Sequence, residues 1–103
     1  MRTKVDYINN SKVILSPKGD INFATSQSLK DALYKVFNDD YKEVIIDFTD
    51  VENIDSEGLG RLLLFHKKLK DNEGILIIRN IESDYIKQMF RTIDLDQVIK
   101  IED

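Results

Sequence analysis

Two short runs, residues 44–46 and 75–79, constrain the fold of this chain more than any other feature. Both consist mainly of consecutive valine, isoleucine and leucine residues, which is typical of parallel strands buried on both faces. Each run lies between two segments in which apolar residues recur at helical spacing. Strands that alternate with helices form crossover units, and these units build a largely parallel sheet. The chain is therefore predicted to have an α/β fold.

Three segments carry an apolar stripe with the period of an α-helix. The first follows Asn22 and Thr25, either of which can cap a helix, the second begins near Ser56, and the third follows Ser83. The residues expected to face the core are Leu29, Ala32, Leu33, Val36 and Phe37 in the first, Leu59, Leu62, Leu63 and Leu69 in the second, and Ile86, Met89, Phe90 and Ile93 in the third.

The N-terminal residues alternate between apolar and polar side chains, and the turn sequence Asn-Asn-Ser follows at 9–11. This pattern predicts a hairpin whose second strand covers residues 12–16 and ends at Pro17, which cannot donate to a strand ladder. Further strands are expected at 43–48 and 98–101. The predicted order is β-β-α-β-α-β-α-β, a mixed, mostly parallel sheet with an N-terminal hairpin. The pattern leaves the order of the strands in the sheet open.

Length and composition narrow the classes of function. A length of 103 residues fits one domain, so residues 1–103 are predicted to form a single unit. There is no cysteine and only one histidine, so no metal or other cofactor is expected. The net charge of −4 argues against direct binding to nucleic acid. No signal peptide or membrane-spanning run is present in the sequence, so a cytoplasmic protein without membrane insertion is expected.

Residues 50–60 combine features that packing explains poorly. Gly58 and Gly60 both lie in the opening turns of a predicted helix, where each costs about 1 kcal/mol relative to alanine. Ser56 stands at the positive end of that helix dipole, between the carboxylates of Asp55 and Glu57. An Asp-Ser pair before a helix is also a good N-cap, so the residues alone leave a purely structural role open.

The sequence Ile-Asp-Ser-Glu-Gly-Leu-Gly at 54–60 resembles the Asp-Ser-Ser/Thr-Gly-Leu-Gly signature of anti-sigma factor antagonists, members of the bacterial STAS domain family. The resemblance extends over most of the chain. Gly-Asp-Ile-Asn at 19–22 is similar to the Gly-Glu-Leu-Asp segment that precedes the first helix of the family. Residues 44–48 resemble its central strand, and residues 86–95 resemble its third helix. The resemblance implies a single STAS-like domain.

The resemblance also implies a switch that is controlled by phosphorylation. In the family, the unmodified domain binds an anti-sigma factor that is also a serine kinase, and thereby releases a sigma factor. Phosphorylation of the serine, here Ser56, ends this binding, and Asp55 is its acidic neighbour. Gly58 and Gly60 would keep the helix face open for docking. The partner-binding residues implied are Asn22, Asp55, Ser56, Glu57, Gly58, Leu59 and Gly60.

Two positions depart from the family pattern. Glu57 stands where the family usually has serine or threonine, and Asn22 stands where it usually has aspartate. Both departures favour an alternative, in which the domain is a non-phosphorylated STAS scaffold within a larger signalling or membrane-transport assembly.

The remaining polar residues are expected to be structural or solvated. His66 has neither a nucleophile nor a metal partner in the sequence, so the chain is predicted not to be an enzyme. The lysines at the end of the second helix and the acidic residues after the strand at 43–48 are interpreted as solvated side chains. They are Lys67, Lys68, Lys70, Asp47, Asp50 and Glu52.

Overall fold

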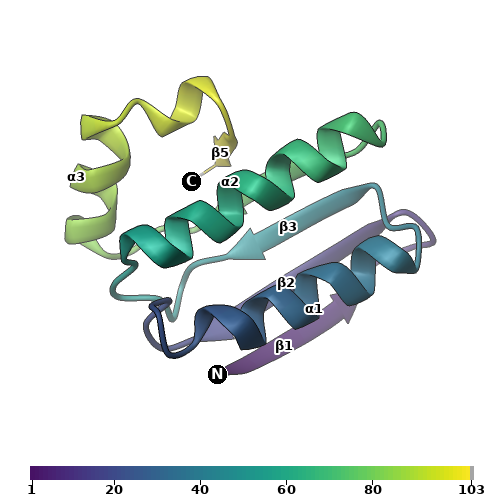
Figure 1. Ribbon diagram of the computed structural model, residues 1–103, viewed down its shortest axis with the longest axis horizontal. Coiled ribbons are helices and arrows are strands. Elements are labelled where there is room, and N and C mark those ends of the chain that lie inside the picture. Colours follow the sequence, from purple (N-terminus) through teal and green to yellow (C-terminus); the bar gives the residue numbers. More distant parts are fainter. Residues whose placement is uncertain (103) are drawn as a thin grey trace.

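The computed structural model describes residues 1–102 and contains one five-stranded sheet with the order β1-β2-β3-β4-β5 (Figure 1). β1 pairs with β2 in antiparallel orientation, and every other neighbouring pair is parallel. The predicted order of elements and the N-terminal hairpin are confirmed. The elements are β1 (Arg2–Tyr7), β2 (Lys12–Lys18), α1 (Ser26–Asn38), β3 (Glu43–Asp47), α2 (Ser56–Asp71), β4 (Ile75–Arg79), α3 (Asp84–Thr92), the 3-10 helix η1 (Leu95–Gln97) and β5 (Lys100–Glu102).

Two predicted boundaries need correction. β2 continues through Pro17 to Lys18, where it pairs with β1 alone because its register with β3 ends at Leu15. The last strand is shorter and later than predicted, because residues 95–97 form η1 and Val98 is exposed to solvent. Of the residues in the predicted strand, only Lys100 and Ile101 lie in β5.

The strand order determines where the helices lie. Each parallel connection leads to the next strand in one direction across the sheet, and right-handed crossovers then place every helix on the same face. Figure 1 shows α1 and α2 side by side in front of the sheet, and the buried side chains of α3 join the same core cluster. The fold is therefore a two-layer α/β structure.

The core between the layers contains two fully buried phenylalanines, Phe48 and Phe65. The Phe65 ring lies 6.0 Å from the ring of Tyr34. Phe65 is a correction to the predicted inner face of α2, since it is buried whereas Leu63 is exposed. On the third helix, Ile86 and Phe90 are buried as expected, but Ile93 is exposed because the helix has ended before it.

The other face of the sheet carries no helix among residues 1–102. Ile14, Ile45 and Ile77 lie next to one another in register on this face, and Ile45 is fully buried. Several neighbours on the same face are charged residues that form ion pairs, such as Lys12 with Glu43 at 3.6 Å. The aliphatic stems of such side chains cover apolar surface while their charged ends stay in water.

Candidate functional site

Two connecting segments meet where the parallel strands β2 and β3 end. Residues 19–25 lead from β2 into α1, and residues 48–55 lead from β3 into α2. Ile21 and Ile54 form a parallel bridge between them. The Ile21 N–H donates to the Asn53 carbonyl at 2.9 Å, and the Asp55 N–H donates to the Ile21 carbonyl at 3.0 Å. The start of α2 is therefore held against the start of α1.

Asp55 is the N-cap of α2 and also binds the neighbouring segment. One carboxylate oxygen accepts a hydrogen bond from the Gly58 N–H at 2.9 Å, within its own helix. The other accepts from the Phe23 N–H at 2.9 Å, across a sequence separation of 32 residues. Both oxygens thus satisfy backbone donors that would otherwise lack partners. The sequence suggested a cap at this point, and the structure shows that Asp55, not Ser56, provides it.

Ser56 is the first residue of α2, and its side chain is exposed. Within the described part of the chain, its hydroxyl makes no hydrogen bond. The backbone N–H groups of the first turn and the helix dipole create a positive end here, which favours a negatively charged group. Glu57 beside it is exposed and lies 3.9 Å from Arg61, a distance typical of a weak surface ion pair.

The two glycines of the signature have different surroundings. A Cβ atom at Gly58 would lie 2.5 Å from Cγ2 of Ile21 and 2.8 Å from its carbonyl oxygen, so only glycine fits there. A Cβ atom at Gly60 would meet no atom of the described residues within 4 Å. Gly58 is buried and serves internal packing, which corrects the expectation that both glycines keep an outer face open. Gly60 lies beside open space.

Asn22 caps the turn that precedes α1. Its side-chain oxygen accepts from the N–H groups of Ala24 at 2.9 Å and Thr25 at 3.1 Å, and the Thr25 hydroxyl accepts from the Asn22 N–H at 2.9 Å. This reciprocal pair resembles a capping box. Of the other partner-binding residues predicted, Leu59 is half-buried against the core.

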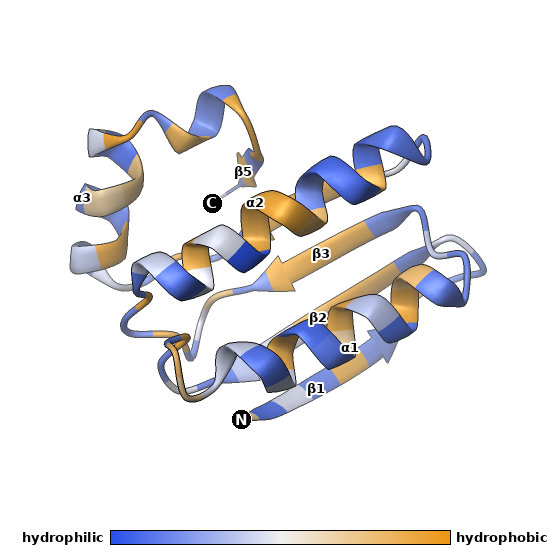
Figure 2. Ribbon diagram, in the orientation of Figure 1, coloured by the Kyte–Doolittle hydropathy of each residue, from blue (hydrophilic) through white to orange (hydrophobic). Residues whose placement is uncertain are grey.

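Sequence reasoning missed three apolar residues close to Ser56. Phe23 lies in the turn whose backbone binds Asp55, and its side chain is 82% exposed. Leu63 and Leu64 of α2 are exposed at 36% and 62%, and their helical positions place them on the same side as Ser56 and Gly60. Figure 2 shows the apolar middle of α2. We call the exposed surface of Phe23, Ser56, Glu57, Gly60, Leu63 and Leu64 the Ser56 face.

No signal in the apolar periodicity could have found Phe23, because it lies outside every helical stripe. Leu63 and Leu64 were missed for a different reason, because they lie within an apolar run of a predicted helix. A run of three leucines at 62–64 covers most of a helix turn, so only packing shows which of them faces the core.

Of the polar residues expected to be structural or solvated, Asp47 differs from expectation, whereas His66 is partly buried as expected. Burial raises the pKa of Asp47, but hydrogen bonds from the Thr49 hydroxyl and N–H and from the Asn80 amide outweigh it, and the pKa lies below its usual value. Asp47 is thus half-buried and bonded rather than solvated. His66 is half-buried; burial and the charge of Lys70 lower its pKa, and its Nδ1 atom has no partner among residues 1–102.

Two further observations bear on the class of protein. Among residues 1–102, no group of histidine, cysteine, aspartate or glutamate side chains could hold a metal ion. No helix in the same range is long and apolar enough to cross a membrane.

The fold agrees with comparisons to known proteins. The family model of the STAS domain matches residues 3–103. The chain belongs to the STAS domain family. A relative from Thermotoga maritima, described as a proposed anti-sigma factor antagonist, is 26% identical over 92 residues, which cover 88% of this chain and 80% of the relative.

Solved structures of several other proteins share this fold. A crystal structure of a proposed anti-sigma factor antagonist from Thermotoga maritima superposes with a TM-score of 0.89 at 22% identity and covers 98% of this chain and 86% of that one. The phosphorylated form of SpoIIAA, a cell fate determinant of Bacillus, superposes with a TM-score of 0.74 at 17% identity and covers 97% of this chain and 90% of that one. A sulfate transporter family protein from Wolinella succinogenes superposes with a TM-score of 0.78 at 20% identity and covers 95% of this chain and 81% of that one.

Proposed function

We propose that this STAS domain is an anti-sigma factor antagonist. It binds an anti-sigma factor with serine kinase activity through the Ser56 face, and this binding releases a sigma factor. Phosphorylation of Ser56 by the bound kinase ends the interaction. The observation that carries the proposal is the exposed hydroxyl of Ser56 at the first position of α2, directly after the capping carboxylate of Asp55.

The surroundings of Ser56 suit a protein partner. The strands are in sequential order, so the sheet lacks the crevice that forms where strand order reverses and where α/β proteins bind small ligands. The Ser56 face instead presents Phe23, Leu63 and Leu64 to solvent. Aromatic side chains are enriched at protein interfaces, and larger exposed apolar patches mark interaction sites.

The electrostatics of the site explain how one phosphate could act as a switch. A phosphoryl group adds a charge of about −1.5 to −2 and three strong acceptor oxygens. The N-terminus of α2 tolerates this anion in the free domain. In a complex, the same anion would be packed against the partner beside the carboxylate of Glu57, where desolvation and repulsion oppose it. The fold would remain while the complex dissociates.

The direct test incubates the protein with its cognate anti-sigma factor kinase and ATP and measures the mass of the product. We expect one added phosphoryl group, located on Ser56 by fragmentation, and none on the Ser56→Ala variant. Ser56→Ala is expected to fold normally and to bind the kinase without being released. An unmodified wild-type protein after incubation with an active kinase would refute the phosphorylation step, while the binding step is tested separately by pull-down.

A second candidate function is a scaffold that is not phosphorylated, within a larger signalling or membrane-transport assembly. Two observations favour it: Glu57 places a carboxylate next to Ser56, and Asn22 uses its side chain to cap a turn rather than to carry a charge. The resemblance to a sulfate transporter family protein is consistent with it. Affinity purification from the native organism separates the two, since an ATP-binding kinase supports the first function and a multi-subunit assembly supports the second.

A further inference from the structure

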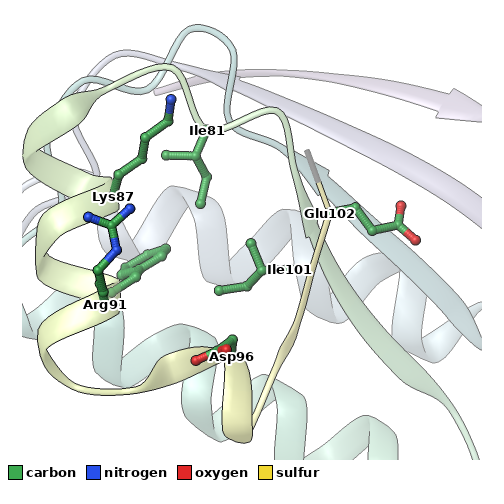
Figure 3. A pocket seen from close by; sticks show the side chains of 7 residues that line it. Ile81, Lys87, Arg91, Asp96, Ile101 and Glu102 are labelled. Carbon is green, nitrogen blue, oxygen red and sulfur yellow. The ribbon is translucent and has the colours of Figure 1, made fainter.

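A second surface feature lies at the C-terminal part of the fold, where α3, η1 and β5 surround an open hollow (Figure 3). Its volume of about 410 Å³ falls within the range of small-molecule sites, about 300–1,000 Å³. The lining is part polar and part apolar, and its apolar residues are the half-buried Ile81 and Ile101 and the buried Phe90. None of the residues that line it belongs to the Ser56 face, so a ligand bound in the hollow would be independent of the proposed function.

Two cations of α3 stand at the rim of this hollow. Lys87 and Arg91 are four residues apart, so both side chains leave the helix on the same side (Figure 3). Both are exposed, and no carboxylate of residues 1–102 lies within ion-pair distance of either. Like charges at this spacing destabilise a helix, so an anion between them would remove an existing repulsion.

The acidic residues of the hollow do not cancel these charges. The Glu102 carboxylate pairs with Arg79 at 3.3 Å and Lys100 at 3.5 Å, and Figure 3 shows it turned away from Ile81 and Ile101. Among the described residues that line the hollow, this leaves Asp96 as the single uncompensated carboxylate, against two cations. The rim therefore carries an excess of positive charge in a chain whose net charge is −4.

We propose that the hollow binds a small amphipathic carboxylate. Its anionic group lies between Lys87 and Arg91, where the guanidinium can donate two parallel hydrogen bonds to a carboxylate. Its hydrocarbon chain lies on Ile81, Phe90 and Ile101. A fully polar anion would leave this apolar lining in water, and a neutral apolar molecule would leave both cations without a counter-charge. The combination of the two features selects a ligand that has both.

The test titrates the isotope-labelled protein with sodium octanoate, below the concentration at which octanoate forms micelles, and follows backbone amide signals by NMR. We expect saturable shifts that are confined to α3, η1 and β5. Hexanoate should bind severalfold more weakly, since a fully buried methylene contributes a factor of about four and the open hollow buries the chain only in part. Octylamine, which has the same chain with the opposite charge, should give no saturable shift at this site.

Variants separate the site from general charge effects. Lys87→Gln combined with Arg91→Gln should weaken octanoate binding at least tenfold, and both exposed side chains can be changed without disturbing the core. The matched control combines Lys18→Gln with Lys70→Gln, which removes the same charge from exposed positions outside the lining of the hollow, and should bind octanoate like the wild type. Equal affinity of the two double variants, or saturable shifts located on other elements, would overturn the proposal.

Discussion

The inner and outer sides of α2 at its N-terminal end have different surroundings, although the residues of both sides lie within the seven-residue segment 54–60. On the inner side, the Asp55 carboxylate accepts one hydrogen bond from the Gly58 N–H of its own helix and one from the Phe23 N–H of the neighbouring segment, and Gly58 lies too close to Ile21 for any side chain. On the outer side, Ser56 and Gly60 have open space around them. The inner residues determine where the helix begins, and the outer residues are free to be modified or bound.

This difference explains how one short segment, residues 55–60, can contain both packed and exposed residues. Helical geometry places residues 55 and 58 over one another and turns 56 and 60 toward another side. The packed inner side fixes the backbone from which the exposed Ser56 side chain projects. The following substitutions test whether the two sides are as separate as the structure indicates.

The largest expected effect is on binding at the outer side. Ser56→Asp places a negative charge where the phosphate would be, and it should weaken binding to the anti-sigma factor by about 3–4 kcal/mol, several hundred-fold. The free energy of unfolding should change by no more than about 0.5 kcal/mol, because the residue is exposed and a helix N-terminus favours an acidic side chain. Calorimetric titration and urea denaturation measure the two quantities. A large loss of stability would show that the sides are coupled.

The inner side should respond most strongly to Gly58→Ala. The new Cβ would overlap Ile21, and overpacking of this kind costs about 1–3 kcal/mol in stability. Gly60→Ala is the matched control, since it adds the same methyl group in open space and should stabilise the helix by up to about 1 kcal/mol. Urea denaturation of both variants gives the comparison. Equal effects at the two positions would contradict the distinction between a packed inner side and an open outer side.

Removal of the cap should have an intermediate effect. Asp55→Ala deletes the acceptor for both the Gly58 and the Phe23 N–H groups, and we expect a loss of about 2 kcal/mol. Asp50→Ala, an exposed acidic residue in the same loop, is the control and should be neutral within about 0.5 kcal/mol. If Asp55→Ala proves as stable as the control, the carboxylate does not join the two segments.

The smallest effect concerns pH and lies further along α2. The pKa of His66 is lowered by burial and by Lys70, so the unfolded chain binds the proton more tightly than the folded one. Stability should therefore fall as the pH drops below about 6.5, the ordinary value for histidine. His66→Gln should remove this slope between neutral pH and the range in which carboxylates titrate. Denaturation curves at several pH values test it, and an unchanged slope in the variant would assign it to another group.

Much of the fold was predictable because the relevant signals are local. The runs at 44–46 and 75–79 and the three helical stripes depend only on neighbouring residues, and they predicted the number, type and order of the main elements. The candidate site at Ser56 could also be predicted from the sequence, since a hydroxyl between an aspartate and two glycines is visible in a short window of sequence. Local signals failed at Leu63 and Phe65, where the choice of the buried side depended on which helix or strand lay opposite, and at Ile93, which follows the end of α3.

The strand order, the uncovered sheet face and the reason for Gly58 lie beyond local patterns. Hydrophobic periodicity specifies which residues seek burial, and this was enough to predict an α/β chain in which residues 56–60 open a helix. It contains no information about which segments become neighbours. The contact of Gly58 with Ile21, the bond from Phe23 to Asp55, and the hollow beside Lys87 and Arg91 arise between parts of the chain separated in sequence, so they exist only once the layers have packed.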